Sequence, residues 1–431
     1  MKQIKIFATS ALTMSLALAS GTANALEPEE QLGKSIFFDK NLSLKKNQSC
    51  ATCHDPGYGW TGPNPAINKK GSVYPGSVKT LFGNRKPPTA AYATTAPVLG
   101  YSVEEGEALF IGGNFWDGRA TGEILGNPAA DQAQGPFLNP VEQALPDPAC
   151  VVYRVCTAQT PAQYPVAFDE VYPMSCDINW PLDLDRSCKD GEMIDMDQPE
   201  RDKVNTAYDN IGLAVAAYEA SPEVNQYTSK FDAYMAGQAE LTPEEDDGLE
   251  LFAGKAMCAA CHVLDPQESG DPPLFTDYTF DNLGVPRNAD NPFYQSEFNP
   301  DGEDWVDPGL GGFLASRPEY AAFAQANLGK QKVPTLRNVD RRLGNGFTKA
   351  YMHNGYFKTL EGVVNFYNTR DVKPVCPDPL TTEADALAQN CWPAPEVADN
   401  VNTDELGNLG LTPEEEAALV AFMKTLSDGY F

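Results

Sequence analysis

The chain has 431 residues and a formal net charge of −29, from 60 acidic and 31 basic residues. An acidic surface of this kind disfavours binding to nucleic acid or anionic lipid and favours basic partners. The length is sufficient for two or three domains with sizeable cores.

The first 25 residues have the pattern of a secretory signal peptide. Lys2 and Lys5 form a basic start, an apolar run over Ile6–Ala19 follows, and Ala23-Asn24-Ala25 fits a cleavage site. We therefore expect a mature chain that begins at Leu26 in the periplasm or at the cell surface. No later run approaches the ~20 apolar residues that a membrane span requires, so no transmembrane segment is expected after cleavage. An uncleaved membrane anchor is the alternative.

Helical signals follow along the chain. Gln31–Phe38 has the pattern of a short helix and Ala207–Ala220 that of an amphipathic one. The sequence Leu-Thr-Pro-Glu-Glu occurs at 241–245 and 411–415, and each copy offers an N-cap threonine, a first-turn proline and a carboxylate three residues after the cap. The first of these two helices should end near Gly254. No run alternates with period two, so we predict a mainly α-helical fold with long loops.

Three stretches rich in proline, aspartate and asparagine resemble insertions, at residues 145–200, 265–330 and 372–407. They either stabilise the fold or form a docking surface for a partner. The first and third carry six cysteines outside the motifs described next: Cys150, Cys156, Cys176, Cys188, Cys376 and Cys391. In an exported protein these cysteines predict three disulfides.

The pairing of these six cysteines is open, because fifteen combinations exist. Short loops favour three bonds: Cys150–Cys156, Cys176–Cys188 and Cys376–Cys391. The sequence alone does not decide among the combinations.

Two Cys-x-x-Cys-His motifs carry the clearest chemistry, and their residues are Cys50, Cys53, His54, Cys258, Cys261 and His262. Haem c is attached through two cysteines three positions apart, and the histidine that follows becomes the proximal iron ligand. Cysteine pairs that share a zinc ion usually lie tens of residues apart, whereas these pairs lie about 200 apart. We therefore expect two covalently bound haem c groups.

The chain has only three histidines, His54, His262 and His353. Once His54 and His262 are proximal ligands, the two irons cannot both have a second histidine ligand. At least one iron must have methionine, tyrosine or an open position on its far side. An open position is what peroxide or another small ligand needs.

Four further segments, read together, are specific: 32–39 (LGKSIFFD) before the first motif, 114–120 (NFWDGRA), 132–142 (QAQGPFLNPVE), and 333–338 (VPTLRN) followed by 351–355 (YMHNG). In these segments the chain resembles the bacterial di-haem cytochrome c peroxidases and their MauG-like relatives. The resemblance implies two cytochrome c-like haem domains, residues 26–200 with the peroxidatic haem and residues 201–431 with the electron-transfer haem. Both would carry the loop-rich, disulfide-stapled insertions.

The resemblance also implies roles for four residues near the first haem. Gln132, Pro136 and Glu142 stand where the family has its distal-pocket residues, with Glu142 as the acid–base group that moves a proton between the peroxide oxygens. Without the resemblance, Glu142 would be read as an ordinary solvated carboxylate. Trp116 matches a tryptophan that lies between the two haems and relays electrons; its alternative is an ordinary core aromatic.

For the second haem, the family spacing of fourteen residues after His353 leads to Tyr367 as the ligand on the far side of the iron. Met352 and His353 remain competing ligands. Many family members also have a histidine after the first haem motif that closes the resting peroxidatic iron, and no histidine occurs here between His54 and His262. Both features favour the MauG-like branch.

The family binds one calcium ion between its domains, and the resemblance places two of its carbonyl ligands at Thr348 and Ala350. A third ligand in the family is an asparagine side chain, but that position reads Lys86 here, with Asn84 two residues earlier. An ammonium group cannot bind Ca²⁺, so the site could be altered or lost.

Functionally, the resemblance implies a di-haem enzyme that uses hydrogen peroxide to oxidise aromatic side chains, such as tryptophan, of an exported protein partner. The first alternative is a cytochrome c peroxidase that reduces hydrogen peroxide with electrons from a small cytochrome or copper protein. The second alternative is a non-enzymatic electron carrier, which would require six ligands at both irons.

Overall fold

The computed structural model describes residues 25–104, 107–158, 164–344 and 346–431. The predicted signal peptide lies outside these ranges, apart from its last residue. Within the ranges that are described, no helix is both long enough and apolar enough to cross a membrane.

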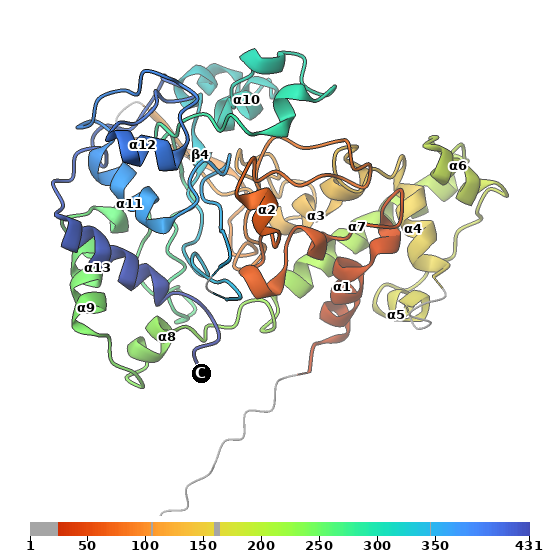
Figure 1. Cartoon of the computed structure of the whole chain (residues 1–431). Coiled ribbons are helices and arrows are strands. Elements are labelled where there is room, and N and C mark those ends of the chain that lie inside the picture. Colours follow the sequence, from red (N-terminus) through yellow and green to blue (C-terminus); the bar gives the residue numbers. More distant parts are fainter. Residues whose placement is uncertain (1–24, 105–106, 159–163, 345) are drawn as a thin grey trace, which may run out of the picture.

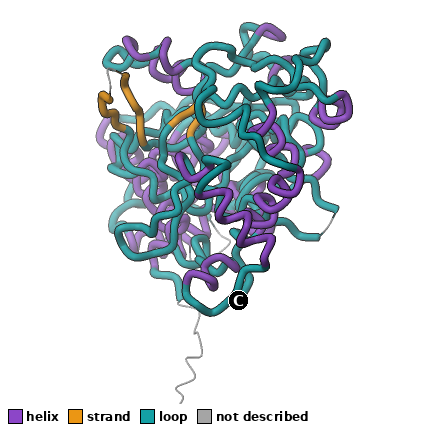
Figure 2. Tube along the Cα trace, turned by 90° about the vertical axis from the view of Figure 1, so that its left-hand side faces the viewer, coloured by secondary structure: helices purple, strands orange, loops and turns teal. Residues whose placement is uncertain are grey.

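The fold is mainly helical, as the sequence predicts (Figure 1). The α-helices are α1 (Pro28–Phe38), α2 (Pro65–Asn68), α3 (Pro128–Leu138), α4 (Pro148–Cys156), α5 (Tyr164–Val171), α6 (Leu184–Asp190), α7 (Gln198–Ala220), α8 (Lys230–Met235), α9 (Pro243–Ala253), α10 (Gly309–Ala315), α11 (Leu360–Thr369), α12 (Glu383–Gln389) and α13 (Pro413–Lys424). Long loops connect them and make up much of the trace in Figure 2.

Strands play a small part in the fold. β1 (Gly100–Glu104) pairs with β2 (Glu107–Ile111) as an antiparallel hairpin in which Tyr101 lies opposite Phe110. β3 (Phe280–Asp281) pairs with β4 (Gln331–Lys332), also antiparallel. Figure 2 shows the strands gathered in one region of the molecule.

Each half of the molecule is organised by a closely packed pair of helices. In the first half α7 packs against α1, α3 and α4, and in the second half α13 packs against α9 and α11. A Cβ atom on Gly33 of α1 would lie 1.8 Å from the carbonyl oxygen of Ala214, and one on Gly248 of α9 would lie 2.0 Å from that of Ala418. Both contacts are possible only without a side chain, so glycine permits the same close approach in both halves.

Local signals in the sequence predicted the helix starts well. Thr242 caps α9, its hydroxyl accepting from the Glu245 amide at 3.3 Å while the Glu245 carboxylate accepts from the Thr242 amide at 2.7 Å. Thr412 caps α13 through the same reciprocal pair with Glu415. The long helix α7 starts at Gln198, nine residues earlier than the sequence pattern indicated, because Asp197 caps it at the Glu200 amide.

Three disulfides form, as expected, but two of the favoured pairings are wrong. Cys376 bonds to Cys391, as the short loop indicated, whereas Cys150 bonds to Cys188 and Cys156 to Cys176. Cys150 and Cys156 both belong to α4, where six residues span roughly 9 Å. That separation exceeds the Cα distance that a disulfide allows, so each cysteine bonds outside its own helix.

The three insertions differ in structure. Residues 145–200 contain α4, α5 and α6, and Val151, Val152 and Val155 of α4 are fully buried in the first core, so this insertion is partly helical. Residues 265–330 contain α10, whose Leu310 and Leu314 pack with Leu99, Phe110 and Phe280 beside the β1–β2 hairpin. Residues 372–407 contain α12 and the third disulfide. The predicted boundary between residues 200 and 201 stays a prediction. The helix α7, which spans this boundary, packs with the first core.

Candidate functional site

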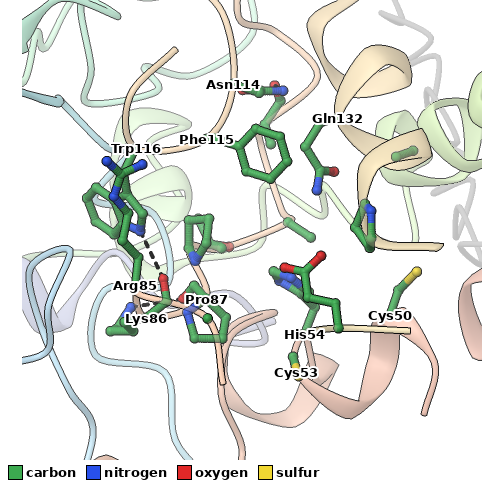
Figure 3. A pocket seen from close by; sticks show the side chains of 18 of the residues that line it. Cys50, Cys53, His54, Arg85, Lys86, Pro87, Asn114, Phe115, Trp116 and Gln132 are labelled. Atoms are coloured by element: carbon green, nitrogen blue, oxygen red, sulfur yellow. Dashed lines mark hydrogen bonds between the residues drawn. The ribbon is translucent and has the colours of Figure 1, made fainter. Parts of the chain in front are cut away.

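The first Cys-x-x-Cys-His motif lies at the wall of a large cavity. Cys50 begins a 3₁₀ turn, and the amides of Cys53 and His54 both donate to its carbonyl oxygen. This local turn directs Cys50, Cys53 and His54 into one cavity. Figure 3 shows these three side chains on one side of the cavity and Gln132 facing them from α3.

The imidazole of His54 is held for metal ligation. Its Nδ1 lies 3.2 Å from the carbonyl oxygen of Trp60, which leaves Nε2 free to bind iron. Burial lowers the pKa of His54 to about 4, against the opposing effect of that hydrogen bond. The ring is therefore neutral at physiological pH, which is the form that binds metals.

The residues predicted for the distal side gather on the same cavity. Gln132 and Pro136 belong to α3, which starts where Asn127 accepts a hydrogen bond from the Ala129 amide at 2.8 Å. Glu142 follows in the loop after α3, and its amide donates to Asn139 O at 2.9 Å. The structure thus brings Gln132, Pro136 and Glu142 together with the first motif.

The carboxyl group of Glu142 lies in an environment suited to proton transfer. Burial raises its pKa, and the nearby Arg119 charge and the Asn139 side chain only partly oppose this shift. A carboxyl group with a raised pKa exchanges protons nearer to neutral pH than an exposed one does. The carboxyl group of Glu142 therefore lies in the cavity wall, partly buried, rather than on the solvated surface.

The second motif lines a second cavity. Cys258, Cys261 and His262 belong to a 3₁₀ turn and the residues after it, and His262 Nδ1 lies 2.8 Å from Phe275 O. Burial lowers the pKa of His262, so this imidazole is also neutral with Nε2 free. The two motifs therefore have the same local geometry.

Three possible far ligands line the second cavity: Met352, His353 and Tyr367. Tyr367 belongs to α11, and its backbone carbonyl accepts from the Gly407 amide, while burial raises the pKa of its phenol group. His353 Nε2 lies 3.9 Å from an Asp307 carboxylate oxygen and 3.7 Å from one of Glu396, so its ring faces two carboxylates.

Trp116 lines both cavities. Its side chain is 8% exposed, its Nε1 donates to Lys86 O at 2.9 Å, and its carbonyl oxygen accepts from the Lys332 amide at 2.7 Å. Figure 3 shows the ring at the end of the first cavity, hydrogen-bonded to the Lys86 backbone. This placement suits an aromatic side chain that passes electrons between the two cavities.

A buried ion-pair network beside Trp116 was not foreseen from the sequence. Arg85 donates from Nη1 to Asp117 at 2.5 Å and from Nη2 to Asp307 at 2.6 Å. Although burial opposes it, the Arg85 charge lowers the pKa of both carboxyl groups. Asp117 directly follows Trp116 and Asp307 belongs to the second insertion, so Arg85 joins the two segments.

Two partly buried lysines, Lys86 and Lys332, line both cavities. Burial lowers the pKa of Lys86 to about 8 and that of Lys332 to about 7. Lys332 Nζ donates to Asn114 Oδ1 at 2.9 Å and to Gly113 O, and Lys86 Nζ donates to Pro87 O at 3.1 Å. Neither ammonium group pairs with a carboxylate of the described chain. Both could therefore pair with an anionic cofactor, such as haem with its propionates.

The residues expected to bind calcium make other contacts within the protein. The carbonyl oxygen of Thr348 accepts from Asn68 Nδ2 at 3.1 Å. Between Thr348 and Ala350, the buried Nζ of Lys349 donates to Asn338 O at 2.8 Å and Arg341 O at 3.0 Å. The calcium expectation receives no support from these contacts.

The two cavities fit covalently bound haem. Their four cysteines are free of disulfides, while the other six cysteines are all bonded. Each cavity combines a thiol pair, a neutral imidazole with a free Nε2, and an unpaired buried cation. We find no group of three or more His, Cys, Asp or Glu side chains elsewhere in the described ranges that could hold a metal ion.

Comparison with known proteins agrees with this geometry. A family model described as di-haem cytochrome c peroxidase matches residues 27–240. The methylamine utilization protein MauG of Paracoccus denitrificans is 34% identical over 417 residues, covering 95% of this chain and 92% of that protein. The cytochrome c551 peroxidase of Pseudomonas aeruginosa is 31% identical over 237 residues, covering 55% of this chain and 50% of that protein.

A solved di-haem peroxidase structure is also similar to this chain. The diheme peroxidase BthA of Burkholderia thailandensis has a TM-score of 0.68 and 27% identity, covering 94% of this chain and 87% of that one. The identity and coverage of the MauG relative extend over nearly the whole chain, including both cysteine motifs. The chain therefore belongs to the di-haem cytochrome c peroxidase family, whose members are peroxide-dependent oxidoreductases with two c-type haems.

Proposed function

We propose that this protein uses hydrogen peroxide to oxidise a protein partner outside the cytoplasm. One observation carries the proposal: among the described residues, His54 is the only histidine that lines the first cavity, and no methionine lines it. The hydroxyls of the three tyrosines that line this cavity already donate to other side chains. Once His54 binds iron from one side, these residues would therefore leave the other side open. Peroxide would then reach the fully oxidised protein without prior reduction.

In the first cavity, Cys50, Cys53 and His54 would hold one haem, which supplies the redox centre that takes two oxidising equivalents from peroxide. Glu142 would take a proton from one peroxide oxygen and return it to the other, so that the leaving oxygen departs as water. Gln132 offers an amide that orients the peroxide by hydrogen bonding. Pro136 contributes an apolar ring to the same cavity wall.

In the second cavity, Cys258, Cys261 and His262 would hold the other haem, with Tyr367 as the far ligand. A phenolate oxygen favours oxidised iron, the opposite of a methionine sulfur. Two contacts support Tyr367: it lines the cavity that contains His262, and His353 faces the Asp307 and Glu396 carboxylates instead. Trp116 would pass electrons between the two haems because it lines both cavities.

A cytochrome c peroxidase fed by a small cytochrome or copper protein is the second candidate. It is favoured by Met352, which lines the second cavity and would supply the sulfur ligand of that class. The relatives include proteins named cytochrome c peroxidase, such as IdrP1 of Denitromonas iodatirespirans, which is 27% identical over 92% of this chain and 80% of that protein. The acidic surface suits a basic electron donor.

The deciding experiment adds stoichiometric peroxide to the fully oxidised protein and follows the optical and EPR spectra. We expect both haems to respond rapidly with no prior reduction. If nothing happens until one haem is reduced, the proposal fails and the peroxidase with a small electron donor becomes the better account.

A further inference from the structure

A second aromatic side chain lies at the wall of the first cavity, away from the Trp116 segment. Tyr92 lines this cavity and is 1% exposed. Its hydroxyl donates to Asp428 Oδ2 at 2.8 Å and accepts from the Tyr227 amide at 3.0 Å. A phenol at a redox cavity therefore has a carboxylate base within hydrogen-bond distance.

The surroundings of this phenol favour loss of an electron and a proton together. The Arg337 guanidinium lies 5.0 Å from the Tyr92 ring centroid and 4.6 Å from that of Tyr227. A neighbouring cation disfavours a positively charged tyrosine radical, so the proton must leave with the electron. Burial and the Asp428 charge raise the pKa of Tyr92, so the phenol is protonated before oxidation.

Asp428 is held in place to receive that proton. Its side chain is buried, its Oδ1 accepts from the Thr228 amide at 3.0 Å, and its Oδ2 accepts from Asn338 Nδ2 at 2.8 Å as well as from Tyr92. These contacts keep the carboxylate beside the phenol oxygen, as a proton acceptor that need not move.

Tyr227 continues the aromatic contact towards solvent. Its ring centroid lies 5.0 Å from that of Tyr92, it is only partly buried, and its hydroxyl accepts from Gln267 Nε2 at 2.9 Å. The backbones of both tyrosines are left-handed, with φ of 59° for Tyr92 and 49° for Tyr227. Bulky residues rarely adopt this strained conformation, and such strain concentrates at functional sites.

We propose that Tyr92 is a redox-active tyrosine that passes oxidising equivalents from the first haem cavity to the surface near Tyr227, where an aromatic side chain of the protein partner supplies the electron. The inference rests on the proposed function. Tyr92 gives one electron to the oxidised centre and its phenolic proton to Asp428, which leaves a neutral radical. One electron from the partner then reduces the radical while Asp428 returns the proton.

The same cavity provides a matched control. Tyr278 also lines it and also has a left-handed backbone, with φ of 62°. Its hydroxyl donates to Thr95 Oγ1 at 2.8 Å, a neutral hydroxyl that is a poor proton acceptor. Tyr278 therefore shares the location of Tyr92 but has no base.

The test is EPR spectroscopy of protein frozen after stoichiometric peroxide. We expect an organic radical signal that narrows when the protein contains ring-deuterated tyrosine, falls at least tenfold in Tyr92→Phe and persists in Tyr278→Phe. An undiminished signal in Tyr92→Phe, or one insensitive to tyrosine deuteration, would overturn the inference. Haem absorbance and thermal unfolding establish that both variants are folded.

A second measurement needs no substitution. The radical oxygen of Tyr92 would accept hydrogen bonds from the Tyr227 amide and from protonated Asp428, so exchange of the wild-type protein into D₂O should narrow the signal further. An unchanged signal contradicts the assignment. If the haem bands of the wild-type protein ignore peroxide, the proposed function itself fails; if they respond but no tyrosine radical forms, only the role of Tyr92 fails.

Discussion

The two haem cavities have nearly identical attachment walls and different opposite walls. In both, a 3₁₀ turn carries the cysteines, and a backbone carbonyl lies near histidine Nδ1. Besides His54, the described residues of the first cavity include no histidine or methionine, and its three tyrosines donate their hydroxyls to other side chains. The second cavity offers Tyr367 and Met352, which are usual iron ligands. Attachment is thus a property of the motif, whereas the role of each haem depends on the opposite wall.

The carboxyl groups of the two cavities reinforce this contrast. The first cavity contains two buried glutamates with raised pKa values, Glu142 and Glu219. The second cavity is lined by Asp307, whose pKa is held low by Arg85 against the effect of burial, and by Asp281, whose pKa burial raises. The two cavities therefore differ in their glutamates, while each contains a carboxyl group whose pKa is raised.

The largest effect should come from the proton-transfer group of the first cavity. In Glu142→Gln we expect the rate of reaction with peroxide to fall ~10²–10⁴-fold, the usual contribution of an acid–base group, with haem absorbance unchanged. Stopped-flow absorbance measures the rate. Glu219→Gln is the matched control, because Glu219 is a buried glutamate of the same cavity. An equal loss in both variants would mean that burial of a carboxyl group matters and the position of Glu142 does not.

The next effect concerns the far ligand of the second haem. Tyr367→Phe removes the phenol oxygen, so we expect the reduction potential of that haem to rise by on the order of 0.1 V, within the ~0.8 V span that axial ligands cover. Spectroelectrochemistry measures the potential. Tyr351→Phe is the control, since Tyr351 lines the same cavity but donates to Asp340 at 3.4 Å. If Met352→Leu shifts the potential and Tyr367→Phe does not, the sulfur ligand and the peroxidase reading are favoured.

A smaller effect follows from the second glutamate of the first cavity. Burial raises the pKa of Glu219 from 4.5 to about 8, so between these values the folded state binds more protons than the unfolded state. The free energy of unfolding should therefore fall as pH rises through this window, by up to about 1.4 kcal/mol per pH unit. Denaturant unfolding at several pH values measures the slope. Glu219→Gln should make the unfolding free energy less dependent on pH in this window. An unchanged slope would mean that other groups cause the dependence.

The smallest expected effect concerns Trp116, the side chain that lines both cavities. Trp116→Phe loses the hydrogen bond to Lys86 O, worth about 1 kcal/mol, and should slow electron transfer between the haems. Trp392→Phe is the control, because buried Trp392 loses a similar bond to Thr369 at 3.0 Å. Transient absorbance compares the transfer rates. Equal rates in the two variants would make Trp116 an ordinary core aromatic.

Sequence reasoning worked best where the deciding contacts are short in sequence, although the start of α7, whose cap also spans three positions, was missed. The caps of α9 and α13 join residues three positions apart, so the helix starts could be predicted. The loop that closes Cys376–Cys391 spans 15 residues and was also predicted, whereas the bond between Cys150 and Cys188, 38 residues apart, was not. A helix between two cysteines changes which of them can meet, and loop length does not reveal this.

The candidate site shows the same division. Gln132, Pro136 and Glu142 were grouped in advance by the family resemblance, and α3 with the loop after it brings them to one cavity. The partners around them could not: Arg85 meets Asp307 from 222 residues away, and Tyr92 meets Asp428 from 336 residues away. No local sequence pattern indicates that these residues pair.

By itself, therefore, the sequence determined the two haem attachment motifs, the capped helices and the shortage of histidines, because each depends on residue identity or on neighbours within a few positions. Only the tertiary structure decided which side chains oppose each histidine, where the buried lysines and the Arg85 network lie, and that Tyr92 has a base beside it. The physical reason is that burial and ion pairing arise when distant segments exclude water together, and the charge state of a group follows from that shared environment.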